Sequence, residues 1–208
     1  MENTSSRKWR PDDPRRLRMA EKRASILNAA RPILLRDGLG ATTLDRVAAE
    51  GGIAKMTLYR HFPNKEELFA GLVNAACDEM RQLIENMTPP GIDQPVAKRL
   101  AGELRAFTSV LVAPDALAIY RMIVADGWRS PELSRAFQQS GMQVIRQRIS
   151  VLLEAGGVPG EKLASRAAEV IALALGDAYL RAVLGIAEEG DDGVFERQIE
   201  VAVAHGLS

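Results

Sequence analysis

The side chains best suited to specific chemical contacts lie between residues 55 and 61 of this 208-residue chain. Lys55 and Arg60 carry cations that can reach guanine edges or phosphates of DNA. Thr57 can donate a hydrogen bond to a phosphate or touch a thymine methyl group, and Tyr59 places a hydroxyl at the end of a rigid ring. These groups lie wholly or partly on the outward face of one short predicted helix. The expected chemistry is therefore non-covalent recognition of a polyanion.

Two elements must position that face. A helix is predicted to begin at Thr43, whose hydroxyl can cap the first turn, and Leu44, Val47 and Ala48 form its apolar side. The pair Gly51-Gly52 ends this helix, because glycine readily takes the left-handed conformation found at helix ends. The second helix follows at about 55–61.

A third helix begins directly after this pair. Asn64 is the predicted N-cap, and Glu67 stands three residues later in a capping-box arrangement. Two short helices joined by a glycine turn form a helix-turn-helix, which lays its second helix in the major groove of DNA. The alternative from periodicity and charge alone is a solvated helical hairpin whose charges keep the protein soluble, because such hairpins are common.

The segment from Gly38 to Leu68 resembles the TetR family of bacterial transcriptional repressors, with the preceding helix from about Lys22. Glycine, hydroxyl, apolar and aromatic positions agree in register over this stretch. The matching residues are Gly38, Thr42-Thr43-Leu44, Val47-Ala48, Gly51-Gly52-Ile53, Thr57-Leu58-Tyr59, His61-Phe62 and Lys65-Glu66-Glu67-Leu68.

Two positions depart from the family pattern. Ala54 stands where the family usually has a serine that caps the recognition helix, and Met56 stands where a small residue is common. The resemblance implies that Thr43 and Lys65 meet phosphates. The residues expected to face DNA are Thr43, Lys55, Met56, Thr57, Tyr59, Arg60, His61 and Lys65.

Charge is divided unevenly along the chain although the formal net charge is zero. Residues 1–65 hold 14 basic and 7 acidic side chains, a net charge of +7, and residues 66–208 hold 13 and 20, a net charge of −7. This asymmetry is expected when only one end of a protein meets a polyanion.

No catalytic set is evident in the sequence. The two histidines, His61 and His205, have no metal-ligand spacing, and the single Cys77 excludes an internal disulfide and a cysteine zinc site. Phosphate-binding and nucleophile-elbow glycine motifs are absent. We therefore expect no enzyme activity, no cofactor and no metal. Cys77 fits a reducing cytoplasm, and no apolar run is long enough for a membrane span.

The remaining chain shows helical periodicity only, so we expect an all-α fold of about nine helices. Residues 1–17 read as a disordered basic arm, either an ordinary frayed terminus or an arm for the minor groove. A helix-turn-helix domain of three helices is predicted over 18–64, starting with a helix at about 18–37. Residues 65–208 should form a helical bundle for ligand binding and dimerisation, with helices at about 65–87, 95–112, 115–126, 131–155, 161–186 and 194–205.

The helix at about 161–186 is apolar on two sides, so it must be covered on both. One side can face its own domain and the other a symmetry mate; the alternative is the central helix of a monomeric bundle. Small residues there would allow a second helix to approach. The predicted dimer interface consists of Gly176, Ala178 and Ala182, with Phe195 and Ile199 of the last helix.

Family members typically hold a small-molecule cavity among the middle helices. The candidate lining residues here are Phe107, Tyr120, Trp128, Phe137 and Tyr179, with Arg105, Arg121 or Asp177 as polar anchors. Plain core packing is the alternative for each aromatic side chain.

The sequence thus predicts a homodimeric transcriptional regulator, a repressor that an unknown small-molecule effector releases from a palindromic double-stranded DNA operator. One alternative is an all-helical enzyme with a small-molecule cavity, and another is a helical adaptor module. The operator sequence, the ligand and the choice between repressor and activator do not follow from the sequence.

Overall fold

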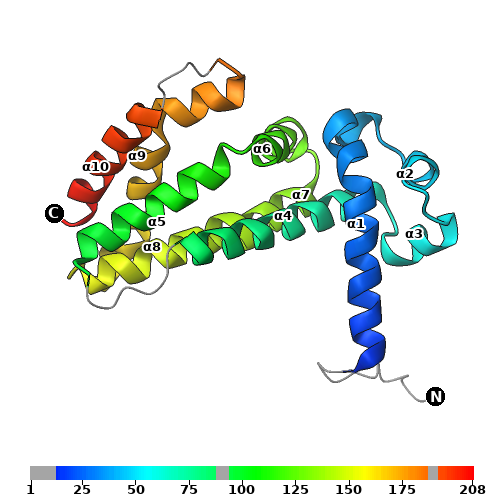
Figure 1. Cartoon of the computed structure of the whole chain (residues 1–208), viewed down its shortest axis with the longest axis horizontal. Helices are drawn as coiled ribbons and strands as arrows, with labels where there is room; N and C mark the ends of the chain where they lie inside the picture. Colours follow the sequence, from blue (N-terminus) through cyan, green and yellow to red (C-terminus); the bar gives the residue numbers. More distant parts are fainter. Residues whose placement is uncertain (1–12, 88–93, 187–191) are drawn as a thin grey trace. The chain divides into compact units, whose positions relative to one another are not determined.

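The computed structural model describes residues 13–87, 94–186 and 192–208. Over these residues the chain is all helical, with no strand, as predicted. It divides into two compact units, Met1–Leu68 and Phe69–Ser208. The elements are α1 Pro14–Ala41, α2 Leu44–Glu50, α3 Lys55–His61, α4 Lys65–Met87, α5 Val96–Leu111, α6 Pro114–Asp126, α7 Pro131–Ala136, a π-helical segment Phe137–Met142, α8 Gln143–Ala155, a 3-10 turn Gly160–Lys162, α9 Leu163–Leu184 and α10 Asp192–Gly206 (Figure 1).

The helix number agrees with the prediction. Because α7, the π segment and α8 run on without interruption, the described residues form nine helices when these three are counted as one. A π segment inside a helix inserts one extra residue and is frequent at functional sites. The sequence predicted a single helix here and did not reveal this bulge.

The first unit contains α1, α2, α3 and the start of α4 (Figure 1). Helix α1 begins at Pro14, four residues before the predicted start, because the Asp13 carboxylate accepts a 2.8 Å hydrogen bond from the Arg15 amide and Pro14 fits the first helical position. Residues 14–17 therefore do not belong to a disordered arm, and residues 1–12 of that predicted arm lie outside the described residues.

Helix α1 is broken at Gly38, which has φ of 69° and ψ of 176°. A side chain with Cβ rarely adopts such a conformation, so the predicted helix end at this glycine is confirmed. Pro32 is accommodated inside α1. The buried face of α1 begins only at Ile26, and Leu27, Ala30, Ile33 and Leu34 continue it.

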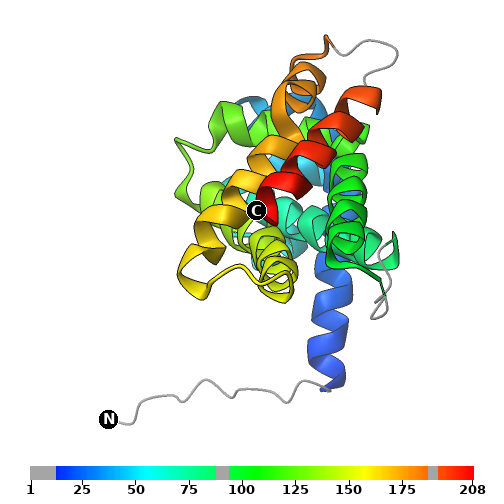
Figure 2. The ribbon, with the colours of Figure 1, turned by 90° about the vertical axis from the view of Figure 1, so that its left-hand side faces the viewer.

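The second unit is a bundle built around α5, α8, α9 and α10. Its core consists mainly of leucine, isoleucine, valine and alanine side chains from these four helices, with Leu100, Leu104, Ile149, Leu153 and Val170 fully buried. Helices α9 and α10 lie side by side in both views (Figures 1 and 2).

None of the described helices is by itself long and apolar enough to cross a membrane. Only α5 and α6 taken together reach such a length and composition, and this pair is bent by 77°.

Candidate nucleic-acid interface and internal cavity

The turn between α2 and α3 fixes the outward face of α3. The Thr43 hydroxyl accepts a hydrogen bond from the Arg46 amide at 3.2 Å, and Gly52 takes φ of 63°. The Ile53 amide then donates to the Ala48 carbonyl at 2.9 Å. Leu58 and Phe62 are fully buried and anchor α3 from its inner side. The predicted helix-turn-helix is therefore present with its expected caps and glycine turn.

The residues of α3 that were predicted to meet DNA point outward to different degrees. Lys55, Met56, Tyr59 and Arg60 are exposed, whereas Thr57 and His61 are half-buried. Met56 is 83% exposed, the highest value among the large apolar side chains of the described residues. An exposed apolar side chain in the centre of this face can contact a thymine methyl group.

Asp45 of α2 links two of these DNA-facing groups. Its carboxylate lies 3.1 Å from the Lys55 ammonium, and it accepts a 3.3 Å hydrogen bond from the Tyr59 hydroxyl. This connection across the turn was not predicted from the sequence. The carboxylate competes with any phosphate for Lys55 and Tyr59.

A cluster of cations surrounds the end of α3. The Arg23 guanidinium donates to the His61 carbonyl at 2.9 Å and lies 4.0 Å from the centre of the Phe62 ring. Burial lowers the pKa of His61, and the positive charges of Arg60, Arg23 and Lys22 lower it further. The smaller contribution of the three cations to this lowered pKa reflects a positive local potential, which suits a polyanion. Arg23 was not among the predicted site residues.

The two predicted phosphate contacts have structural roles as well. The Lys65 ammonium donates to the Leu39 carbonyl at 2.8 Å, and Asn64 caps α4 by accepting from the Glu67 amide at 2.8 Å. Thr43 is exposed at the start of α2. Phosphate contact by Thr43 and Lys65 stays a prediction.

Helix α3 begins without a side-chain cap, because Ala54 occupies the N-cap position. We expect Ala54→Ser to raise the free energy of unfolding by about 1 kcal/mol, since a serine hydroxyl can accept one of the unpaired amides of the first turn. Urea denaturation of both proteins measures this difference. Ala54→Gly is the control, and equal stability of the serine and alanine proteins would contradict the prediction.

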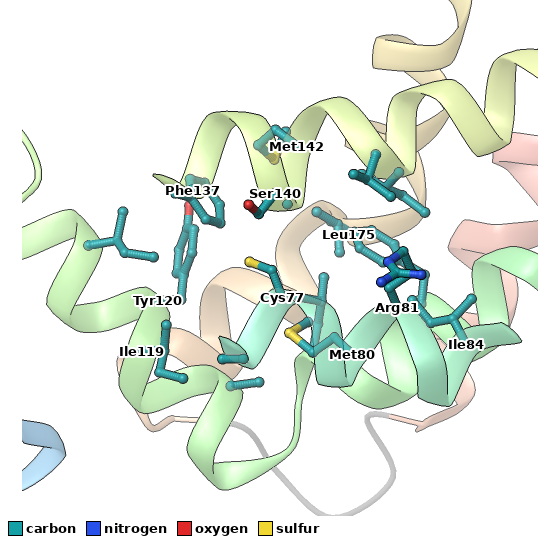
Figure 3. A pocket seen from close by; sticks show the side chains of 18 of the residues that line it. Cys77, Met80, Arg81, Ile84, Ile119, Tyr120, Phe137, Ser140, Met142 and Leu175 are labelled. Atoms are coloured by element: carbon teal, nitrogen blue, oxygen red, sulfur yellow. The ribbon is translucent and has the colours of Figure 1, made fainter. Parts of the chain in front are cut away.

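A cavity of about 290 Å³ lies within the second unit. Five helical stretches contribute to its wall: α4, α5, α6, the π segment with α8, and α9 (Figure 3). Most lining side chains are apolar, and Cys77, Met80 and Met142 bring sulfur atoms to it. The π segment supplies Phe137, Ser140, Gly141 and Met142, so the helical bulge shapes this wall.

Four of the five aromatic residues predicted for a pocket line this cavity, namely Phe107, Tyr120, Phe137 and Tyr179. Trp128 is not one of the residues that line it. Helix α6 ends before it, so Trp128 falls in the following turn, 74% exposed, where its ring nitrogen donates to the Ala125 carbonyl at 3.1 Å.

The predicted polar anchors are engaged elsewhere. Arg105 pairs with Glu196 of α10 at 2.9 Å, and Arg121 donates to the carbonyls of Ala182 and Val183 at the end of α9. Asp177 is exposed and is not part of the cavity wall. The charged residues in the wall are instead Arg81 and Arg148, which sequence reasoning missed because their carboxylate partners lie on other turns or helices.

Two of the five residues predicted for a dimer interface are buried within one chain. Ala178 and Ile199 are each 1% exposed. Ala182 and Phe195 are half-buried, and Gly176 is exposed. The large exposed apolar side chains on α9 and α10 are Leu173, Leu180, Leu184 and Val201. The dimer interface stays a prediction.

No group of three or more histidine, cysteine, aspartate or glutamate side chains within the described ranges could hold a metal ion. Burial, with the nearby charge of Asp78, raises the pKa of the Cys77 thiol to about 11. Since the thiolate is the reactive form, this thiol is expected to react slowly.

Two family models match the chain. Residues 26–72 match the bacterial regulatory proteins of the tetR family, and residues 98–207 match the C-terminal domain of AefR-like transcriptional repressors. The first match covers α2 and α3, and the second covers the helices that follow α4.

Individual proteins agree with these models. YfiR, an uncharacterised helix-turn-helix transcriptional regulator of Bacillus subtilis, is 26% identical over 143 residues, 68% of each chain. The solved structure of the flavonoid-responsive regulator FrrA is 27% identical with a TM-score of 0.75, covering 90% of this chain and 96% of that one. A structure from Mesorhizobium loti assigned to the same family shares the fold, at 24% identity and a TM-score of 0.77 over 91% and 96% of the two chains.

Proposed function

We propose, since this chain belongs to the TetR family of bacterial transcriptional regulators, that it is a cytoplasmic homodimeric repressor which a small molecule releases from a palindromic operator. The family consists of regulators and not enzymes, which removes the enzyme alternative. The observation that carries the proposal is the outward face of α3, where Lys55, Met56, Tyr59 and Arg60 are exposed on a helix anchored by Leu58.

Selection from a random duplex pool tests the DNA-binding proposal. We expect an enriched palindrome whose half-sites lie one or more helical turns apart, because a two-fold dimer presents two recognition helices. Affinity should fall steeply with salt, since lysine and arginine displace counterions from phosphates. A pool that yields no enriched sequence at low salt would refute an operator-binding role and favour a helical adaptor. Repression is tested by a reporter gene placed behind the selected operator.

The contacts of Asp45 lead to a gain-of-affinity prediction. Asp45→Asn removes one negative charge beside the DNA-facing surface and breaks the 3.1 Å ion pair with Lys55. We expect operator and non-specific duplexes to bind more tightly by a similar factor, about 5-fold for a gain of roughly 1 kcal/mol per complex. Fluorescence anisotropy measures both affinities. The control is Glu132→Gln in the second unit, which removes an equal charge from a pair with Arg135. Unchanged or weaker binding by Asp45→Asn would contradict the prediction.

The exposed apolar face of α9 and α10 supports the homodimer. Leu173, Leu180 and Leu184 of α9 are 37%, 54% and 62% exposed, and Val201 of α10 is 57% exposed. Large exposed apolar side chains on two neighbouring helices are typical of an interface between subunits.

We expect Leu180→Asp to dissociate the dimer, because a buried carboxylate without a partner is costly. Light scattering at micromolar concentration should give a dimer for the unmodified protein and a monomer for the variant. Val151→Asp is the matched control, since Val151 is 52% exposed on α8. A dimer that survives Leu180→Asp would place the interface elsewhere, and a monomeric unmodified protein would exclude it.

Release by a ligand is supported by the cavity and by helix α4. This helix starts at Lys65 in the first unit and contributes Ala76, Cys77, Met80, Arg81 and Ile84 to the cavity wall in the second. A molecule in the cavity can therefore act on the helix whose first turn ends the DNA-binding motif. It shifts the DNA-competent state only as far as it prefers the other state.

The flavonoid response of the similar regulator FrrA suggests flavone as a first effector to test. A coupling of roughly 1–3 kcal/mol would weaken operator binding about 5- to 150-fold. By reciprocity, saturating operator should weaken flavone binding by the same factor. A cavity ligand that binds equally well with and without operator would not be an effector.

A further inference from the structure

One buried polar atom beside the cavity has no hydrogen-bond partner among the described residues. The Tyr179 side chain of α9 is 7% exposed, lines the cavity, and its phenol oxygen makes no hydrogen bond with any described residue. Burial raises the pKa of this phenol, and the nearby Tyr120 raises it further. The group therefore remains an O–H donor at neutral pH. A buried donor without an acceptor is uncommon in folded proteins, because it loses its hydrogen bond to water without replacement.

We propose that the cavity takes an uncharged molecule with two aromatic rings and an oxygen acceptor, and that this oxygen accepts a hydrogen bond from the Tyr179 hydroxyl. The inference rests on the proposed ligand-controlled function and names the chemical class of the ligand. Tyr179 is then the residue that determines specificity for the acceptor.

The aromatic rings of the proposed ligand follow from the aromatic side chains in the cavity wall. The Tyr120 ring centre lies 5.4 Å from that of Tyr179 and 6.0 Å from that of Phe137, with the planes tilted by 58° and 59°. Tilted ring pairs at such distances are favourable, and a further ring can extend the arrangement. Cys77, Met80 and Met142 line the cavity as well (Figure 3). Sulfur atoms make favourable contacts with aromatic ring edges.

The expectation of an uncharged ligand follows from the ion pairs that the charged residues of the cavity wall already make. Arg148 binds the Glu103 carboxylate through two nitrogens at 2.5 and 3.0 Å, and it lies 3.3 Å from Glu85. Arg81 pairs with Asp78 at 3.2 Å and with Glu85 at 3.4 Å. Two cations are thus already matched by three carboxylates. A ligand carboxylate would have to displace one of these, and a ligand cation would lose its hydration without an uncommitted carboxylate.

The size of the ligand follows from the cavity volume of about 290 Å³. This value lies at the lower end of the usual range for small-molecule sites, about 300–1,000 Å³. Two rings with a short linker suit such a space. Benzophenone has two phenyl rings joined by a carbonyl, and diphenylmethane has the same rings without the oxygen, so the two form a matched pair of probes.

The test measures both probes against the full chain and against Tyr179→Phe by isothermal titration, without DNA. Benzophenone should bind the unmodified protein and lose about 3- to 10-fold in affinity with Tyr179→Phe, the value of one neutral hydrogen bond. Diphenylmethane should bind both proteins equally. Equal losses for the two probes, or no loss for either, would overturn the assignment of the hydroxyl, and so would failure of the unmodified protein to bind benzophenone.

Two further measurements test whether Tyr179 is the donor and whether the ligand is uncharged. Tyr120→Phe removes the neighbouring hydroxyl and should leave the preference for benzophenone intact; loss of the preference in this variant alone would make Tyr120 the donor and overturn the proposal. The anion 4-benzoylbenzoate should bind more weakly than benzophenone, and tighter binding would overturn the uncharged class.

Two features of the experiment distinguish a loss of ligand binding from a loss of folding and from a failure of the proposed DNA release. Thermal unfolding should show Tyr179→Phe to be at least as stable as the unmodified protein, because the unpaired hydroxyl is gone. The probe measurements involve no DNA. If benzophenone binds through Tyr179 and yet operator affinity is unaffected, the ligand class stands and the proposed release mechanism fails.

Discussion

Replacing Gly176 with alanine should lower the free energy of unfolding by about 3 kcal/mol, from backbone strain together with overpacking. Gly176 interrupts α9 with φ of 42° and ψ of −147°. A residue with Cβ rarely adopts a positive φ of this kind, whatever the available space. In addition, a Cβ at this position would lie 2.3 Å from the terminal amide of the Gln198 side chain on α10. The chain must therefore strain its backbone, and the Gln198 side chain must turn away from the new methyl group.

Urea denaturation at fixed protein concentration measures this effect. A double variant separates its causes: Gln198→Ala in the Gly176→Ala background should recover the steric part of the loss, whereas the part due to backbone strain should persist. Gly102→Ala in α5 is the control, because its Cβ would meet no atom within 4 Å; there alanine should stabilise the helix by about 0.5–1 kcal/mol. A Gly176→Ala protein as stable as the unmodified one would show that α9 can close this break.

The role of Gly176 shows where sequence reasoning reaches its limit. A helix that is apolar on two sides can be covered by its own bundle, by a second subunit or by both. The pattern predicted a helix that must be covered on two sides, and it assigned small residues to a partner. In the structure Ala178 is buried by the chain's own helices, whereas Gly176 and the leucines at 173, 180 and 184 are exposed. Periodicity defines faces, but it does not say which face meets which neighbour.

Local features were predicted more completely. The cap at Thr43 involves the amide of Arg46, and the cap at Asn64 involves the amide of Glu67, so each depends on residues three positions apart, and both caps are present. The glycine turn before α3 is equally local. Contacts that join separate helices were not visible, among them the pair of Asp45 with Lys55 and the pair of Arg148 with Glu103. The π segment also escaped prediction, because its sequence carries an ordinary helical pattern.

The cavity could be predicted only in part from the sequence. The aromatic candidates that lie inside a helix, such as Phe107 and Tyr179, line the cavity. Trp128 lies two residues past the end of α6 and is exposed to solvent. Ligand binding by these residues stays a prediction. The partner-free hydroxyl of Tyr179 could not be predicted, since it depends on what all surrounding helices leave unpaired.

Arg60→Ala should have the largest effect on specific DNA binding. Arg60 is exposed on α3, and within the described residues it makes no hydrogen bond or ion pair, in contrast to Lys55 beside Asp45. Its guanidinium is therefore available to bind a guanine edge through two hydrogen bonds. Such a contact contributes about 1–3 kcal/mol. A two-fold dimer makes it twice, so the loss should reach about 2–6 kcal/mol, or roughly 30- to 25,000-fold in affinity.

Anisotropy titrations measure this loss and its origin. They use the selected operator and a scrambled duplex, each over a series of KCl concentrations. If Arg60 reads a base, Arg60→Ala should weaken the operator far more than the scrambled duplex, and Arg60→Lys should restore charge without restoring selectivity, because an ammonium lacks the planar pair of donors. Arg135→Ala on α7 removes an equal charge outside the helix-turn-helix and should change neither affinity. Equal weakening of both duplexes, with a shallower dependence on salt, would instead make Arg60 a phosphate contact. The reading of bases would then rest on the remaining outward residues of α3, with Met56 at their centre.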